Sequence, residues 1–370
     1  MSCDFLSLAL PGVQKLSPYV PGKPVEELAR EFGLDPNEII KLASNENPLG
    51  PAPMALKAIQ AALPELTRYP DGNGFALKQA LSRHFGFDLS MITLGNGSND
   101  ILELLARAFV LPEHEVVFSQ HAFAVYPIVT QAVGATAVEV PAREWGHDLE
   151  AMAAAITPAT RLVFIANPNN PTGTWIERAD FEAFMEQVPE QVLVVLDEAY
   201  TEYVDVKGAL NGFDFVARYP NLIVSRTFSK AYGLAALRVG YCLSDPQVAD
   251  VLNRVRQPFN VNSLALAAAV ASLQDNAYLA ESRRANREGM LQLEQGFRAL
   301  GLGWIASRGN FVAVDLGREA APVYQGLLRE GVIVRPVAGY GMPNHLRISI
   351  GLPQENKRFL DALARVLIGE

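Results

Sequence analysis

The stretch Leu222-Ile-Val-Ser-Arg-Thr-Phe-Ser-Lys230, followed by Arg238, decides how this chain is expected to fold. Its first three residues are apolar at consecutive positions, which predicts a short buried strand. Hydroxyl side chains and a lysine follow that strand directly. Open α/β sheets bind ligands just beyond the carboxyl ends of their strands. The stretch is therefore the expected position of a ligand site in an α/β fold.

Lys230 and its neighbours have the chemistry to bind an aldehyde and a phosphate. A primary amine that is desolvated and placed near other cations has a lowered pKa, and is then a nucleophile toward carbonyls. The hydroxyls of Thr227 and Ser229 and the guanidinium of Arg238 are suitable donors to a phosphate. Together these groups suggest pyridoxal 5′-phosphate. A lone Ser-Lys pair is more often a surface lysine at a strand end, so the rest of the chain has to support the assignment.

Composition restricts the class of protein. The 370 residues, 49% hydrophobic and 19% charged, predict a large core that splits into two domains. The net charge of −9 argues against nucleic acid as a partner, because phosphate backbones recruit basic surfaces. With Cys3 and Cys242 as its two cysteines, the chain predicts no disulfide framework and a cytoplasmic location. The five histidines are scattered, which argues against a metal site.

Targeting and membrane segments are not expected. The first ten residues contain a short apolar run without a basic segment before it, so they do not resemble a signal peptide. A run of about 18 apolar residues, which a membrane span needs, does not occur.

The middle of the chain alternates short β-branched runs with longer amphipathic stretches, the pattern of an α/β protein. Several runs are apolar at consecutive positions, as expected where helices cover both faces of a mainly parallel sheet. We expect strands at Glu115–Ser119, Thr136–Val140, Leu162–Ala166, Val192–Leu196, Leu222–Ser225 and Val239–Leu243, and helices at Asn99–Val110 and Arg178–Gln187.

After about residue 260 the pattern changes. We expect a long helical stretch at Ser263–Leu300, interrupted near Gln274, then strands at Gly309–Leu316, Val332–Arg335 and His345–Ile350 and a last helix at Gln354–Ile368. This order predicts a large domain at residues 46–262 and a smaller α+β domain at residues 263–370. The N-terminal arm, residues 1–45, is expected to belong in part to the smaller domain.

Gly95-Asn-Gly-Ser-Asn-Asp100 opens one of the expected helices. Glycines allow the backbone to approach a ligand, and the free N–H groups of a helix start favour a phosphate, so Ser98 and Asn99 are candidate ligands. A dinucleotide-binding loop competes with this interpretation, but Asp100 stands where its third glycine would be. A helix start capped by Ser98 or Asn99 is the plain structural alternative.

Three further candidates follow expected strands. Phe123 is placed to stack on a pyridine ring, or else packs in the core. The rigid turn Asn167-Pro-Asn-Asn-Pro-Thr-Gly173 presents Asn170 to a ring oxygen, unless it is only a tight turn. Asp197 ends a buried strand and needs a partner, which a protonated pyridine nitrogen would supply, with Tyr200 reaching the ring oxygen. An aspartate that caps the next element is the alternative.

The order of these segments resembles the fold-type-I pyridoxal-phosphate aminotransferases, over essentially the whole chain. The resemblance implies a seven-stranded sheet in an α/β/α sandwich. It also implies that Lys230 binds the cofactor aldehyde, that Asp197 faces the pyridine nitrogen and that Phe123 stacks on the ring. Asn170 and Tyr200 would hold the ring oxygen; the implied phosphate ligands are Ser98, Asn99, Thr227, Ser229 and Arg238.

Two segments narrow the resemblance. Leu42-Ala-Ser-Asn-Glu-Asn-Pro-Leu-Gly-Pro51 and Arg68-Tyr-Pro-Asp-Gly72 are similar to signature segments of histidinol-phosphate aminotransferases. That family implies a homodimer in which Tyr69 reaches the partner's cofactor phosphate. It also makes Asn47 a candidate substrate ligand and matches Tyr19 to a tyrosine that closes over the substrate.

Two arginines are the expected contacts for substrate charges. Arg347 matches the arginine that binds an α-carboxylate in aminotransferases generally, and Arg335 stands nearby in the sequence. A guanidinium binds phosphate and carboxylate alike, so both are expected to serve histidinol phosphate as well as glutamate or 2-oxoglutarate. A salt bridge at a strand end is the alternative for each.

The implied reaction is a ping-pong transamination that interconverts histidinol phosphate and 3-(imidazol-4-yl)-2-oxopropyl phosphate in histidine biosynthesis, with Lys230 moving a proton. Close alternatives are an aromatic amino-acid transaminase and a threonine-phosphate decarboxylase. A regulator's effector domain is disfavoured because the chain has no basic helical extension. A nicotinamide dehydrogenase is disfavoured by the missing third glycine.

Overall fold

The computed structural model describes residues 3–206 and 208–369, and its centre is a seven-stranded sheet. The strands are β2 (Ile92–Gly95), β3 (Glu115–Ser119), β4 (Thr136–Val140), β5 (Thr160–Ala166), β6 (Leu193–Asp197), β7 (Leu222–Thr227) and β8 (Gly240–Leu243), in the order β2-β8-β7-β6-β5-β3-β4. Neighbours from β7 to β4 are parallel, whereas β8 runs antiparallel to both β2 and β7. The expected mainly parallel, seven-stranded sheet is confirmed.

Helices cover both faces of this sheet because its central strands are apolar on both sides. Val194 and Val195 of β6 belong to different apolar clusters, since successive side chains of a strand point to opposite faces. One cluster includes residues of α3 (Pro53–Ala62), α4 (Phe75–Phe85), α7 (Leu149–Ala154), α8 (Arg178–Met185) and α10 (Ser263–Ser272). The other includes residues of α5 (Ser98–Phe109), α6 (Val125–Ala132) and α9 (Pro246–Val255). The fold is therefore an α/β/α sandwich.

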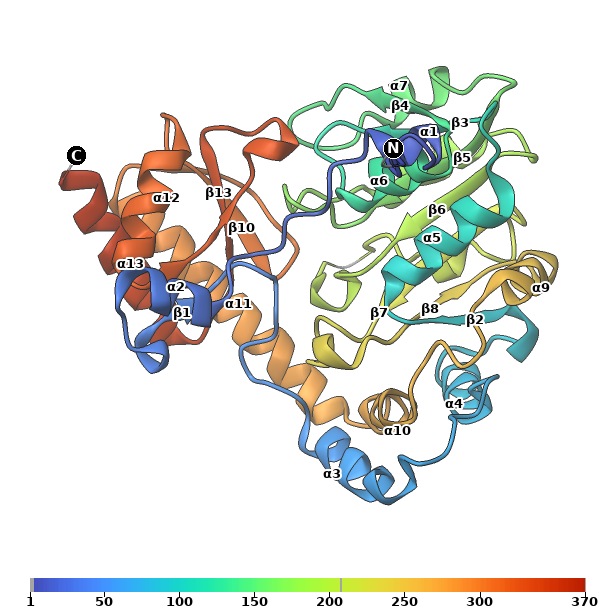
Figure 1. Ribbon diagram of the computed structural model, residues 1–370, viewed down its shortest axis with the longest axis horizontal. Coiled ribbons are helices and arrows are strands. Elements are labelled where there is room, and N and C mark those ends of the chain that lie inside the picture. Colours follow the sequence, from blue (N-terminus) through green and yellow to red (C-terminus); the bar gives the residue numbers. More distant parts are fainter. Residues whose placement is uncertain (1–2, 207, 370) are drawn as a thin grey trace.

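A smaller antiparallel sheet forms the second part of the molecule, on the left of Figure 1. Its strands are β9 (Gly303–Ile305), β10 (Phe311–Asp315), β12 (Arg335–Pro336) and β13 (His345–Ser349), in the order β12-β13-β10-β9. The helices α11 (Asn276–Ala299), α12 (Ala320–Arg329) and α13 (Pro353–Ile368) pack against it. Strands and helices are mixed, as expected for an α+β unit.

The N-terminal residues contact both parts. β1 (Ile40–Lys41) pairs in parallel with β11 (Val332–Ile333), and α2 (Val25–Phe32) packs beside that pair. The short helix α1 (Pro11–Gln14) instead lies against α6 of the large sheet. The arm thus crosses from one part to the other, and Figure 1 shows it passing between them.

The expected interruption near Gln274 is confirmed, because α10 ends at Ser272 and α11 begins at Asn276. Ala265 and Ala269 of α10 lie in the core of the large sheet, whereas Leu293 of α11 lies in the core of the small one. The domain limits stay a prediction, and this packing favours a boundary between α10 and α11 over one at residue 263.

Within the two described ranges, no helix is both long enough and apolar enough to cross a lipid bilayer.

Candidate active site

A cavity of about 370 Å³ opens at the carboxyl ends of β5, β6 and β7, between the two parts of the molecule. Most of the predicted site residues line it: Tyr19, Ser98, Asn99, Phe123, Asn170, Asp197, Tyr200, Thr227, Ser229, Lys230, Arg238, Arg335 and Arg347. These residues come from segments more than 300 positions apart in the chain. The fold thus brings the sequence candidates together; Asn47 and Tyr69 are the two that it places elsewhere.

Lys230 lies in the turn after β7, with its ammonium inside the cavity. Its Nζ donates to the carbonyl oxygen of Ser44 at 3.4 Å, a long and weak hydrogen bond. Burial, followed by the nearby Arg347 guanidinium, lowers the pKa of Lys230 to about 8. An amine with this pKa is partly neutral near physiological pH, and is then both a nucleophile and a proton acceptor.

Asp197 ends β6 and is buried, with one carboxylate oxygen unpaired. Its Oδ2 accepts a hydrogen bond of 3.0 Å from the hydroxyl of Tyr126, while its Oδ1 has no hydrogen-bond partner. Burial raises the pKa of Asp197 to about 6. An unpaired buried carboxylate is costly, so the structure leaves room here for a cationic partner. A protonated pyridine nitrogen has that chemistry, and the site therefore fits the predicted cofactor.

Tyr126 was missed by the sequence reasoning. It lies on α6, three residues after Phe123, and its ring stacks on Phe164 at a centroid distance of 4.6 Å. The two rings of Phe123 and Tyr126 also meet edge to face, with centroids 5.9 Å apart. Side chains three residues apart are neighbours in a helical turn. The aromatic pair Phe123 and Tyr126 could therefore have indicated from the sequence that Tyr126 lies near the site.

The start of α5 and the segment before β8 form a close backbone cradle. Gly97 precedes α5 with a φ of 85°, and a Cβ atom there would collide with the Arg238 guanidinium. A Cβ on Gly240 would lie 2.6 Å from the amide nitrogen of Ser98. Arg238 Nη1 donates to Ser229 Oγ at 3.3 Å. Glycine is needed at both positions, and Arg238 and the first residues of α5 line the cavity.

The hydroxyl of Thr227 is already engaged. It donates to the carbonyl oxygen of Val239 at 3.4 Å and accepts from the amide nitrogen of Ser229 at 3.1 Å. These two hydrogen bonds stabilise the turn in which Ser229 lines the cavity.

Tyr200 and Asn170, which follow strands of the large sheet, form hydrogen bonds at the cavity wall with the N-terminal arm and with the small sheet, respectively. The hydroxyl of Tyr200 accepts from Asn45 Nδ2 at 3.0 Å, and burial raises its pKa to about 12. Arg347 of β13 donates through Nη1 to Asn170 Oδ1 and through Nη2 to the carbonyl oxygen of Ala43 at 2.7 Å. Its buried Nε has no partner. This arginine therefore keeps a donor for a further acceptor.

Tyr19 and Arg335 form the outer wall of the cavity. The Arg335 guanidinium carbon lies 5.4 Å from the centre of the Tyr19 ring, and its Nη2 donates to the carbonyl oxygen of Val20 at 2.7 Å. Both residues also line an adjoining cavity of about 460 Å³, to which His121 and Tyr340 contribute aromatic side chains. The sequence reasoning gave neither His121 nor Tyr340 a role in the site, although His121 stands only two residues before Phe123.

Asn47 and Tyr69 lie outside the cavity. Asn47 Nδ2 is within 3.0 Å of the carbonyl oxygen of Ala231, next to Lys230, and within 2.9 Å of Ser282 Oγ. Tyr69 is 82% exposed, and its ring stacks on Phe259 at 4.8 Å. Within one chain, Asn47 braces the lysine-bearing turn and Tyr69 projects outward.

Comparisons with known proteins agree with this geometry. The profile of the family described as aminotransferase class I and II matches residues 37–363. The chain is 71% identical to a protein named histidinol-phosphate aminotransferase 2 from Pseudomonas fluorescens, over 99% of both chains. It is 70% identical to the protein of that name from Pseudomonas aeruginosa, over 98% of this chain and 99% of the other.

A solved structure leads to the same family. The crystal structure of histidinol-phosphate aminotransferase from Sinorhizobium meliloti, in complex with pyridoxal 5′-phosphate, superposes with a TM-score of 0.90 at 34% identity and covers 97% of each chain. With a matching family profile over most of its length and relatives of this identity over nearly all of it, the chain belongs to the class I and II aminotransferases, and among them to the histidinol-phosphate aminotransferases.

Proposed function

We propose that this protein transfers an amino group between histidinol phosphate and 2-oxoglutarate, forming glutamate, in histidine biosynthesis. The observation that carries the proposal is one cavity in which the buried amine of Lys230 and the unpaired oxygen of Asp197 occur beside two arginines. Relatives of 70% identity and more carry the matching name.

The donors in the cavity fit each part of pyridoxal 5′-phosphate. Asp197 would bind the pyridine nitrogen through Oδ1, while Tyr126 holds the other oxygen. The phosphate would bind at the start of α5 and at Arg238. Asn170 and Tyr200 are the candidates for the ring oxygen, and Phe123 is the candidate for the ring face. When bound, the cofactor supplies an aldehyde for the amino group and a ring that accepts electrons.

Lys230 then has two roles in the chain's own chemistry. Its Nζ would hold the aldehyde carbon of the bound cofactor, and its free amine would accept and return the proton of the substrate carbon. A pKa of about 8 lets the same nitrogen release and bind a proton near neutral pH. Asp197, held by Tyr126, would keep a negative charge beside the ring nitrogen.

Arg347 and Arg335 are proposed as the substrate-charge ligands. Arg347 is buried and has a spare Nε donor, which suits a carboxylate. Arg335 lies at the mouth beside Tyr19, where a longer substrate places its phosphate. The adjoining aromatic cavity has room for a flat ring.

The second subunit is part of the proposal. Tyr69 is too exposed to serve its own cavity and is held outward by Phe259, which favours a homodimer in which it completes the partner's phosphate site. The cytoplasmic location expected from the cysteine content stays a prediction.

Turnover measurements test the proposed substrates. We expect the purified enzyme to use histidinol phosphate with 2-oxoglutarate far better than phenylalanine or tyrosine. Arg335→Gln should raise the KM for histidinol phosphate by about tenfold or more, because one charge-assisted contact is lost, with a smaller effect on the KM for glutamate. Arg329→Gln, an exposed change on α12, is the matched control.

Two results would overturn the assignment. Preference for the aromatic amino acids would make the enzyme an aromatic transaminase. Failure of glutamate to convert the bound cofactor to its amino form would instead indicate a decarboxylase.

A further inference from the structure

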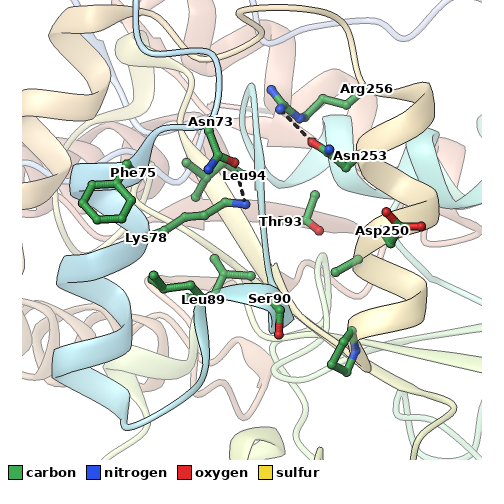
Figure 2. A pocket seen from close by; sticks show the side chains of 13 residues that line it. Asn73, Phe75, Lys78, Leu89, Ser90, Thr93, Leu94, Asp250, Asn253 and Arg256 are labelled. Atoms are coloured by element: carbon green, nitrogen blue, oxygen red, sulfur yellow. Dashed lines mark hydrogen bonds between the residues drawn. The ribbon is translucent and has the colours of Figure 1, made fainter.

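A second cavity, of about 320 Å³, lies beside the edge strand β2 and shares no lining residue with the active site. Its two walls are formed by α4 and α9, and β2 runs between them (Figure 2). Two cationic residues line this cavity. Lys78 belongs to α4, and Arg256 is the first residue after α9. The first cavity accounts for the proposed reaction without this one.

The two cations of this cavity have neutral partners. Lys78 Nζ donates to Asn73 Oδ1 at 3.2 Å. Arg256 donates through Nη1 to Asn260 Oδ1 at 2.8 Å and through Nη2 to Asn253 Oδ1 at 2.9 Å. Amide oxygens satisfy the N–H groups but carry no net charge, so both positive charges remain uncompensated at these contacts.

Nearby carboxylates are committed to other groups. Asp250 also lines the cavity, and its carboxylate forms an ion pair with Arg254 at 2.5 Å. Asp71 accepts from the amide nitrogens of Asn73 and Phe75 at 2.9 and 2.7 Å. Among the described residues, none places a carboxylate oxygen within ion-pair distance of Lys78 or Arg256.

Asp100 is the remaining acidic group near this cluster. Its Oδ2 accepts from the amide nitrogen of Asn96 and from Asn260 Nδ2, both at 2.8 Å. It attracts Arg256 from behind Asn260 but does not face the cavity. Burial, and then the Arg256 charge, lower the pKa of Lys78, while the charge of Asp71 acts in the opposite direction and partly offsets this shift.

We propose that this cavity binds a phosphate-type oxyanion, either inorganic phosphate or the phosphate group of a small monoester, between Lys78 and Arg256. The guanidinium offers a planar fork and the ammonium a point charge, the two groups that proteins use for phosphate oxygens. Amide groups of Asn73 and Asn253 stand beside them as further polar contacts. The volume accommodates a phosphate and a short organic tail.

Binding to the cofactor-loaded enzyme tests this proposal. Inorganic phosphate is titrated calorimetrically at constant ionic strength, with chloride replaced in step, in an Arg335→Gln background that removes the proposed phosphate ligand of the active site. We expect one saturable event, weakened about tenfold or more in Lys78→Gln/Arg256→Gln. Lys57→Gln/Arg329→Gln, two exposed positions with the same total charge change, should leave it unaltered. Repeating the titration with glycerol 3-phosphate distinguishes free phosphate from a monoester.

Three outcomes would refute the site. They are no saturable binding in the parent protein, equal binding in both double variants, or a change in sedimentation of the Lys78/Arg256 variant without any phosphate response. The last would assign the two cations to a subunit contact. Turnover of the Lys78→Gln/Arg256→Gln enzyme should equal that of the parent, so failure of this site and failure of the proposed reaction are separable.

Discussion

Lys230 and Asp197 show how burial prepares a site before any ligand arrives. Desolvation disfavours the charged form of both groups, so it lowers the pKa of the lysine and raises that of the aspartate. The charged form of Asp197 would therefore be stabilised by a cationic partner, and the neutral form of Lys230 is available to react with a carbonyl. The Arg347 charge adds to the lowering of the Lys230 pKa, whereas the hydrogen bond from Tyr126 favours the charged form of Asp197 and partly offsets the effect of burial.

Asp197→Asn should separate fold from activity. The change keeps an acceptor for Tyr126 but removes the charge proposed to bind the pyridine nitrogen, so kcat should fall by about a hundredfold or more. The cofactor-free variant should melt at the same temperature as the parent or higher at pH 7, since an unpaired buried carboxylate is gone. Steady-state kinetics and a thermal melt give the two readouts. A variant with parental kcat would contradict the assignment.

Lys230→Met makes a pH-dependent prediction for the cofactor-free protein. The folded-state pKa of Lys230, about 8, lies below its ordinary 10.5, so folding carries an uncompensated buried charge at neutral pH. We expect the methionine variant to be more stable than the parent at pH 7. Between about pH 8 and 10.5 the folded parent loses its proton while the unfolded chain keeps it, so parental stability rises relative to the variant.

Denaturation midpoints of the two proteins across that pH range provide the measurement. Lys57→Met, on the surface of α3, is the control for adding a methionine. A stability gap that stays constant from pH 7 to pH 10.5 would be inconsistent with a lowered pKa.

The site residues within local motifs could be predicted from the sequence, but the residues that form hydrogen bonds with them could not. Asn170, Asp197 and Lys230 each follow an apolar strand, and that pattern was enough to find them. Tyr126 and Asn45 act through a partner far away in sequence, which no local pattern reveals.

Among the elements, strand positions were predicted more accurately than strand direction. β3 and β4 have the expected bounds, and β5, β6, β7 and β8 begin or end within two residues of them. The short strand β2 was missed. The antiparallel direction of β8 could not be predicted from its sequence, because a strand that is buried on both faces has the same apolar pattern in either direction.

The reversal has a function in the site. The segment between β7 and β8 contains no α-helix to cross the sheet, so it turns back, and parallel pairing would need a longer crossover. Arg238, with a φ of 55°, thereby returns beside Ser229. The proposed phosphate cradle therefore depends on this turn as well as on the identity of its residues.

A buried ion pair joins β6 to β7 beneath the site and gives a prediction for these elements. Arg226 Nη2 lies 2.6 Å from Glu198 Oε2, both side chains are buried, and Glu198 also accepts from the amide nitrogen of Gly212 at 2.7 Å. Arg226→Met should leave Glu198 unpaired and destabilise the protein by about 3 kcal/mol or more. Glu198→Gln/Arg226→Met should recover part of that loss, because the charge of Glu198 is removed as well, whereas the buried carboxyl of Glu202 still lacks the neighbouring Arg226 charge.

Urea denaturation of the parent, the single variant and the double variant measures the coupling. Arg178→Met, which removes an exposed ion pair with Asp214, should cost far less. A double variant no more stable than Arg226→Met would show that packing, and not the unpaired charge, causes the loss.

At the scale of the whole molecule, the site exists only where the two parts meet. Arg347 belongs to the small sheet, yet it donates to Asn170 of the large domain and to Ala43 of the N-terminal arm. Composition and periodicity predicted two parts but not this junction, which came from family resemblance. The N-terminal arm connects the two parts, because β1 pairs with β11 of the small part and α1 packs on α6 of the large one.

The proposed role of Tyr69 in the site of a second chain is tested with hybrid dimers. Lys230→Ala and Tyr69→Ala chains should each form dimers of low activity. Dimers assembled from one chain of each kind should regain activity, because the site with an intact Lys230 receives Tyr69 from the Lys230→Ala chain. Each hybrid then contains one complete site and one that lacks both groups.

The control places both substitutions on one chain and mixes it with the parent. If Tyr69 acts across the interface, the parental subunit of that hybrid has Lys230 but no tyrosine from its partner, which carries Tyr69→Ala, so this hybrid should be nearly inactive. If Tyr69 serves its own chain, the order reverses: the doubly substituted hybrid keeps one good site and the first hybrid has none. The exposed stack of Tyr69 on Phe259 favours the first outcome, since it holds the phenol away from the cavity of its own chain.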